Sequence, residues 1–200
     1  LPICFTLDTL PAEQFARYVY GCLVEARAGG AEVPPLDIHI ASEVPMGVGL
    51  SSSAALEVAT LRALRQLLAL PLDDVQVAQL AQQAEVLHAG VRCGILDQMA
   101  ASLADTRRAL LLDTRSLARR FVPLPAGSAI LVLDSGLARS LAASGYNQRR
   151  AECEAAAAQL GVASLRDLPG LQALPAAARL PAPLDRRVRH VLTENDRVLR

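Results

Sequence analysis

A loop rich in glycine and serine leads directly into a long helical pattern, and this junction constrains the fold more than any other stretch. Residues 45–55 are PMGVGLSSSAA. Gly47 and Gly49 allow backbone conformations that other residues avoid, and they let a ligand approach the main chain. The start of the following helix presents unpaired N–H groups and the positive end of the helix dipole. The junction therefore predicts a binding site for an anion such as phosphate.

The same loop has an ordinary explanation, which is a turn whose serine caps the helix. Three consecutive serines at 51–53, directly after the two glycines, favour phosphate binding instead. All 20 basic residues of the chain are arginines, so a lysine-dependent Walker loop and a pyridoxal Schiff base are excluded. Backbone amides, hydroxyl groups and a metal ion such as magnesium must then neutralise the phosphate.

The composition excludes several other classes of protein. Of the 200 residues, 52% are hydrophobic, and the 20 basic residues balance 20 acidic ones. This argues against disorder and against a nucleic-acid partner, and no stretch predicts a membrane span. The four cysteines show no CxxC spacing, so we expect no zinc site and no disulfide framework. Without a signal-peptide pattern we expect a cytoplasmic protein, and the start at Leu1 suggests a fragment.

Hydrophobic periodicity predicts an α+β fold of one domain, or of one domain plus part of another. Asp73 is expected to cap a helix and Gly90 to end it, whereas residues 162–184 predict an irregular connector with short helical turns. Glu57 projects onto the apolar face of its helix, and the sequence names no partner for it. The expected helices are 12–28, 53–70, 73–89, 147–160 and 185–200, and the expected strands are 36–40, 109–113 and 128–134.

Residues 45–59, PMGVGLSSSAALEVA, resemble the second motif of the GHMP kinase superfamily, and their form is most similar to the galactokinase family. Four further segments resemble galactokinase segments in the same order: 93–99, 109–117, 144–150 and 187–195. The family's first motif, GRxNLIGEHTDY-like, and its last, GGGFGG-like, are absent from the sequence.

The resemblance implies a two-lobed GHMP kinase fold that is incomplete at both ends. Residues 1–120 would form the N-terminal lobe, which is similar to domain 2 of ribosomal protein S5, and residues 121–200 would begin the C-terminal lobe. The implied activity is transfer of the γ-phosphate of ATP to the C1 hydroxyl of α-D-galactose. The implied partners are galactose and ATP, with no nucleic acid, no membrane and a monomeric state.

The resemblance also assigns residues to the site. Ser53 and Glu85 would bind Mg²⁺, and Asp97 would be the catalytic carboxylate that accepts or orients the proton of the attacking hydroxyl. Gly94, Asp97 and Tyr146 would contact the sugar. Without the resemblance, Glu85 would be a solvated surface residue, Asp97 a cap or turn residue and Tyr146 a packing residue. The residues implied to wrap the ATP phosphates are Gly47, Val48, Gly49, Leu50, Ser51, Ser52 and Ser53.

Three alternatives remain open. A kinase of the same superfamily that acts on another sugar would share these motifs, because the missing first motif supplies most of the sugar contacts. A non-catalytic sensor of galactose and ATP would bind the same ligands, but such proteins lose residues of the serine loop, whereas Ser51–Ala54 is intact here. An inactive remnant of a truncated gene is the third alternative.

Overall fold

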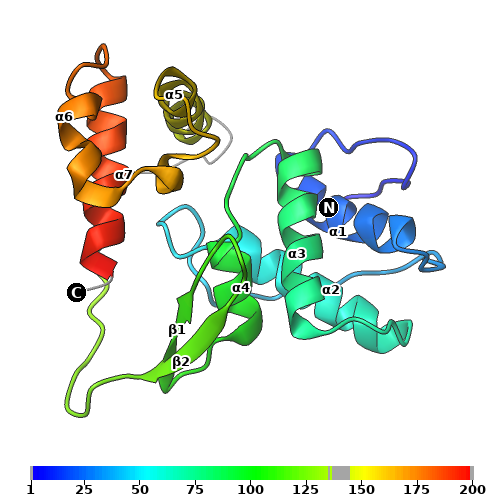
Figure 1. The fold of residues 1–200 in the computed structure, drawn as a ribbon. Coiled ribbons are helices and arrows are strands. Elements are labelled where there is room, and N and C mark those ends of the chain that lie inside the picture. Colours follow the sequence, from blue (N-terminus) through cyan, green and yellow to red (C-terminus); the bar gives the residue numbers. More distant parts are fainter. Residues whose placement is uncertain (1, 135, 137–144, 199–200) are drawn as a thin grey trace. The chain divides into compact units, whose positions relative to one another are not determined.

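The computed structural model describes residues 2–134, 136 and 145–198 (Figure 1). The chain divides into two units, Leu1–Ala143 and Ser144–Arg200, which are considered separately below. Among the described residues, no helix is long and apolar enough to cross a membrane. The expected lobes, 1–120 and 121–200, stay a prediction, because these units are defined by contacts and not by the family's lobe boundary.

Three helices of the first unit, α1 (Gln14–Ala28), α2 (Ser52–Leu67) and α3 (Asp74–Ala84), pack around one apolar core. The apolar face expected for α2 is confirmed, because Val58, Leu61 and Leu64 are buried and Arg62 is exposed. The core is formed by Val19, Cys22, Leu23, Ala26, Val58, Leu61, Leu64, Val77, Ala81 and Ala84.

Helix α3 begins and changes at residues that the sequence marks. The Asp73 carboxylate accepts hydrogen bonds from the backbone of Val75 and Gln76, both at 2.8 Å, and thus caps the helix as predicted. After Ala84 the backbone widens into a π-helical turn, η1 (Glu85–Ala89), which ends at Gly90 with φ of +76°. The predicted helix 73–89 is therefore confirmed in extent, but its last five residues are π-helical.

A short helix and a hairpin follow in the described part of the first unit. Helix α4 (Leu96–Leu103) was not expected from the sequence. Strands β1 (Arg108–Leu112) and β2 (Arg119–Pro123) pair antiparallel, with Leu110 opposite Phe121. The predicted strand 109–113 is confirmed within one residue, although it is exposed or half-buried and not fully buried. Strand β2 was not predicted.

Two predicted strands, 36–40 and 128–134, were wrong, because neither segment forms a ladder. A strand needs a partner for its backbone N–H and C=O groups, and among the described residues only β1 and β2 pair. The apolar side chains of both segments consequently remain accessible to solvent. Ile38 is 43% exposed, and Ile130, Leu131 and Leu133 are 78%, 79% and 81% exposed.

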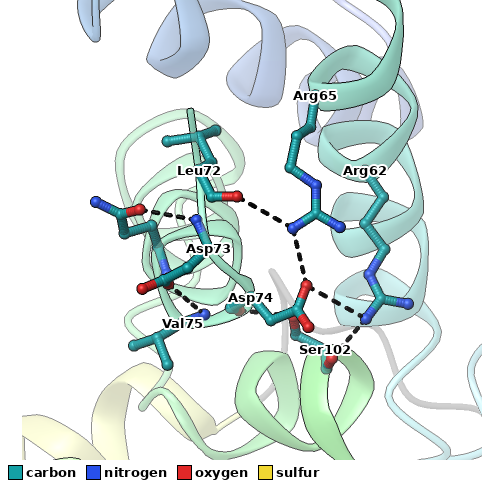
Figure 2. A network of polar contacts seen from close by, with 8 residues as sticks. Arg62, Arg65, Leu72, Asp73, Asp74, Val75 and Ser102 are labelled. Carbon is teal, nitrogen blue, oxygen red and sulfur yellow. Dashed lines mark hydrogen bonds and ion pairs between the residues drawn. The ribbon is translucent and has the colours of Figure 1, made fainter. Parts of the chain in front are cut away.

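A network of polar contacts joins α2, α3 and α4 at one end (Figure 2). Asp74, in the first turn of α3, accepts a hydrogen bond of 2.8 Å from Arg65 of α2. Arg62 donates to the backbone oxygen of Ser102 in α4 at 2.6 Å, and the Ser102 hydroxyl donates to the backbone oxygen of Asp74 at 2.7 Å. We call Arg62, Arg65, Asp74 and Ser102 the helix clamp. It fixes the C-terminal halves of α2 and α4 against the start of α3.

The second unit is helical in its described part. Helices α5 (Tyr146–Gln159) and α7 (Leu184–Val198) match the helices expected over 147–160 and, as far as residue 198, over 185–200, and they share an apolar core. The last two residues of the second expected helix, 199 and 200, lie outside the described residues. Between them lie three short helical turns, as predicted for residues 162–184: η2 (Leu165–Asp167), η3 (Gly170–Ala173) and α6 (Leu174–Ala177). An ion pair of 2.5 Å between Arg187 Nε and Glu152 Oε2 links α7 to α5.

Candidate active site

The predicted phosphate loop precedes α2 as a series of bends; residues 45–50 are exposed and Ser51 is half-buried. Gly47 and Gly49 have φ of +76° and +84°, and Ser51 has φ of +53°, so three alternate residues adopt a left-handed backbone conformation before the helix. Ser51 lies at the N-cap position of α2, but its side chain makes no capping hydrogen bond. The ordinary explanation of the loop, a serine that caps the helix, is therefore not supported at this residue.

Ser53 and Glu85 come together although 32 positions separate them in the sequence. Ser53 is the second residue of α2, and Glu85 is the first residue of the π-turn. Burial raises the pKa of Glu85, which is 3% exposed, whereas hydrogen bonds from Ser53, Cys93 and Gln98 act in the opposite direction. The negative charge of Asp97 raises it further, so Asp97 lies within electrostatic range of Glu85.

The donor set of Ser53 and Glu85 fits Mg²⁺. Both supply hard oxygen atoms, and Mg²⁺ commonly takes one or two protein oxygens together with phosphate and water oxygens. Within the described ranges, no group of three or more His, Cys, Asp or Glu side chains forms a complete metal cage.

The two predicted sugar contacts of the first unit, Asp97 and Gly94, lie around the start of α4. Asp97 is an exposed residue in the first turn of that helix. Gly94 is also exposed, and a Cβ atom added there would meet no described atom within 4 Å. No described atom blocks the approach of a ligand to Gly94, and its expected contact with a sugar stays a prediction.

The third predicted sugar contact, Tyr146, belongs to the other unit. It is the first residue of α5 and is 44% exposed. Because the two units are described separately, the expected proximity of Tyr146 to Asp97 stays a prediction.

The sequence reasoning missed a buried polar cluster that adjoins Glu85. Gln98 of α4 is fully buried, and its side-chain nitrogen lies 2.7 Å from Glu85 Oε2 and 3.2 Å from Glu57 Oε2. The Cys93 thiol donates to the same Glu85 oxygen at 3.5 Å. We call Glu57, Glu85, Cys93 and Gln98 the carboxyl cluster. Its sequence signal was Glu57, a carboxylate on an apolar helix face whose partner could not be named.

The carboxyl cluster has unusual electrostatics because it lies in the protein interior. Burial and the neighbouring Glu85 raise the pKa of Glu57 to about 9, so Glu57 is neutral at pH 7. Burial and the same Glu85 raise the pKa of the Cys93 thiol to about 12, which makes it a poor nucleophile. Two buried oxygens, Glu57 Oε1 and Gln98 Oε1, have no hydrogen-bond partner among the described atoms.

A surface hollow lies elsewhere in the first unit. It has a volume of about 900 Å³ and is lined by residues 2–8, by residues 33–40 and by one side of α1. No predicted site residue lines it. Its walls are mainly apolar side chains from segments without a strand partner, so we do not assign the chemistry to it.

The chain is similar to a protein family, to a curated protein and to a solved structure. Residues 17–105 match the family model of the GHMP kinases N terminal domain. A curated galactokinase from Roseiflexus sp. (strain RS-1) is 44% identical, and the match covers 98% of this chain and 52% of that protein. The crystal structure of Lactococcus lactis galactokinase complexed with galactose has a TM-score of 0.79 at 28% identity, covering 96% of this chain and 51% of that one.

These findings confirm the α+β GHMP kinase fold that the sequence motifs predicted. The chain spans about half the length of the curated relative it matches. The matched family model covers most of α1 and all of α2, α3, η1 and α4, and so includes Ser53, Glu85 and Asp97. Family model, sequence relative and solved structure agree, and the chain belongs to the GHMP kinase family.

Proposed function

We propose that the complete protein is a galactokinase, which transfers the γ-phosphate of ATP to the C1 hydroxyl of α-D-galactose. The observation that carries this proposal is the grouping of Ser53, Glu85 and Asp97, which come from three different helices and interact around Glu85. The proposal is supported by the 44% identity to a curated galactokinase. It is also supported by the likeness to a galactokinase crystallised with galactose.

In the proposed reaction, different residues of the chain would bind the phosphates, bind the metal and handle the proton. Backbone amides and hydroxyls of residues 47–53 would hold the phosphates of ATP, since a helix start favours negative charge. Ser53 and Glu85 would hold Mg²⁺, which when bound would neutralise charge on the transferred phosphate. Asp97, exposed at the start of α4, would accept or orient the proton of the sugar hydroxyl. Phosphoryl transfer depends mainly on positioning and charge neutralisation, so this small set suffices.

The central test replaces Asp97 by asparagine in the complete protein. Asp97→Asn keeps the side-chain size and removes the negative charge. We expect kcat to fall by about 10²- to 10⁴-fold, the range that general-base catalysis supplies, while galactose and ATP affinities change much less. A merely structural Asp97 would instead lower the melting temperature and leave kcat per folded molecule unchanged, and that result would refute the catalytic assignment.

A second test concerns the metal. Glu85→Gln and Ser53→Ala should each raise the Mg²⁺ concentration needed for half-maximal activity, because each removes a metal ligand. An unchanged Mg²⁺ dependence would remove that residue from the metal site. Phosphorylation of a different sugar would favour a related sugar kinase, and tight binding of galactose and ATP without turnover would favour a sensor.

The use of ATP and the state of the cysteines bear on the cellular compartment of the proposed enzyme. All four cysteines, Cys4, Cys22, Cys93 and Cys153, are free, as expected in a reducing compartment where ATP is available. We therefore propose a cytoplasmic enzyme. A monomeric state remains our expectation for the complete protein.

A further inference from the structure

The side-chain amide of Gln98 lies between two carboxyl groups that come from different helices. Its nitrogen carries two hydrogens, and one carboxyl oxygen accepts each of them: Glu85 Oε2 at 2.7 Å and Glu57 Oε2 at 3.2 Å. Glu85 Oε2 also accepts from the Cys93 thiol, so it acts as an acceptor here, and the NH₂ group of Gln98 suits this position better than its carbonyl. Gln98 and Glu57 are both 0% exposed, so water cannot replace either partner.

The carboxyl cluster is costly to stability, which suggests that it serves another purpose. Glu57 Oε1 and Gln98 Oε1 are buried without a hydrogen-bond partner among the described atoms, and such groups destabilise the folded state. An apolar pair of similar volume would fill the same space without this cost. What the polar pair provides is a directed hydrogen bond to Glu85, a bond that apolar side chains cannot make.

Gln98 also links Glu85 to Asp97 through the backbone. The two residues are consecutive in the first turn of α4, where Asp97 is exposed and Gln98 is buried. A rotation or shift of α4 would therefore move both groups together. The hydrogen bond to Glu85 therefore contributes to the position of α4 relative to Glu85, and thereby to the separation of the Asp97 and Glu85 side chains.

We propose that Gln98 is a positioning residue that holds the Glu85 carboxylate beside Ser53, and that Glu57 is the buried anchor of Gln98. Glu57 accepts from the second N–H and so keeps the amide in place. By holding Oε2 of Glu85, Gln98 fixes the orientation of the carboxyl group that would bind the metal. The inference rests on the proposed function, in which Ser53 and Glu85 hold Mg²⁺.

The first experiment replaces Gln98 by methionine in the complete protein. Methionine is also unbranched and of similar size, but it has no N–H donor. We expect the Mg²⁺ concentration for half-maximal activity to rise about 10- to 100-fold, as is typical when the hydrogen-bond partner of a metal ligand is lost. Binding of Mn²⁺ in the presence of ADP, followed by electron paramagnetic resonance without turnover, should weaken by the same factor.

The matched control is Ser102→Ala in the same helix. Ser102 is buried and donates a hydrogen bond of 2.7 Å to the backbone of Asp74, but it belongs to the helix clamp at the other end of α4. We expect this variant to lower the melting temperature and to leave the Mg²⁺ dependence unchanged. An equal shift of the Mg²⁺ dependence in both variants would mean that general loosening of α4 is responsible, and it would overturn the positioning role.

Two further variants test the anchor. Glu57→Gln keeps an oxygen that can accept from Gln98, so it should retain the Mg²⁺ dependence of the wild type. Glu57→Leu removes the acceptor, so it should shift the dependence in the same direction as Gln98→Met but less strongly. Combining Glu57→Leu with Gln98→Met should add nothing beyond Gln98→Met alone, because the anchor acts only through the amide.

The outcomes separate this inference from the function on which it rests. If Glu85→Gln leaves the Mg²⁺ dependence unchanged, the metal assignment itself fails. If Glu85→Gln shifts the dependence and Gln98→Met does not, the metal site stands and the positioning role of Gln98 is wrong. Should Gln98→Met not fold, Gln98→Asn keeps a buried amide but withdraws it by one methylene, and a wild-type Mg²⁺ dependence of that variant would likewise refute the proposal.

Discussion

Glu57 shows how a single carboxyl group can occupy an apolar core. Its side chain is 0% exposed, on the face of α2 that also carries Val58 and Leu61. Burial of a carboxylate without a countercharge favours the protonated form, and no basic side chain contributes to the pKa of Glu57. The group is therefore accommodated as a neutral acid that accepts one hydrogen bond from Gln98.

This protonation makes stability depend on pH. The pKa of Glu57 is about 9 in the folded protein and near 4.5 when unfolded. Between these values the folded state holds a proton that the unfolded state has released, so the free energy of unfolding falls as pH rises. We expect the stability of Glu57→Gln relative to the wild type to be constant below pH 4.5 and to rise from pH 4.5 to pH 9, by at most about 1.4 kcal/mol for each pH unit. Urea denaturation of both proteins at several pH values checks this, and a constant margin would contradict it.

At the scale of residues, the sequence predicted the local chemistry but not the partners. The cap at Asp73 and the stop at Gly90 depend on neighbours within a few positions, and both are confirmed. The link from Glu57 to Gln98 joins residues 41 positions apart, and no local pattern specifies which helix will cover a given face. The sequence indicated only that Glu57, an acidic residue, lies on an apolar helix face.

Helices α2, α3 and α4 are fixed to one another at both ends. The carboxyl cluster joins the starts of α2 and α4 to the end of α3, and the helix clamp joins their opposite ends. Ser53 and Asp97, which lie on the first turns of α2 and α4, thus belong to one braced body. Rigid helices are better suited than loops to hold catalytic groups within a fraction of an ångström.

The packing of α1 against α3 supplies a test at the level of the elements. A Cβ atom at Gly21 would lie 2.9 Å from both the Cβ and the backbone oxygen of Ala84. Ala84 directly precedes Glu85. We expect Gly21→Ala to lower the free energy of unfolding by about 1–3 kcal/mol, the usual cost of overpacking, despite alanine's higher helix propensity.

Chemical denaturation measures this difference, with Gly29→Ala, at the C-cap of α1, as the control. Gly29 is exposed and has φ of −75°, and a Cβ atom there would approach no atom closer than 3.4 Å. The control should therefore stay close to wild-type stability. Equal stability of Gly21→Ala and the wild type would show that α1 and α3 can separate without cost, contrary to the close packing described.

The elements that were predicted wrongly share one physical feature. Helices satisfy their backbone hydrogen bonds internally, so the five predicted from periodicity all appear, within a few residues at their ends. Strands require partners from elsewhere, and the alternation at 36–40 or the apolar run at 128–134 contains no information about a partner. Helix α4 was missed because residues 96–103 are too short for periodicity to distinguish.

For the molecule as a whole, the motif order was more informative than the pattern of elements. Periodicity alone suggested an α+β fold, whereas the loop at 45–55 with the segments at 93–99 and 109–117 indicated the family that the comparisons show. The described structure brings Ser53, Glu85 and Asp97 together within the first unit. The predicted sugar contacts stay a prediction, because Tyr146 belongs to the second unit and the two units are described separately.

The 200-residue chain by itself should show negligible galactokinase turnover. It spans about half of its curated relative, and two of the three motifs of the galactokinase family are absent from its sequence. Production of galactose 1-phosphate by the purified chain, compared with its Asp97→Asn variant, measures this. Robust turnover that Asp97→Asn abolishes would show that these residues suffice, and the prediction would be wrong.

The isolated chain should also self-associate through residues 128–134. Ile130, Leu131 and Leu133 are 78%, 79% and 81% exposed, and an apolar segment with unpaired backbone groups favours association with another strand. Replacing both Leu131 and Leu133 by serine in one double variant should shift the protein toward monomer, because the two substitutions remove apolar surface and neither side chain packs in a core. Sedimentation velocity across a range of concentrations distinguishes the cases. A wild-type chain that stays monomeric at high concentration, or a double variant that associates equally, would mean that this segment is not the adhesive surface.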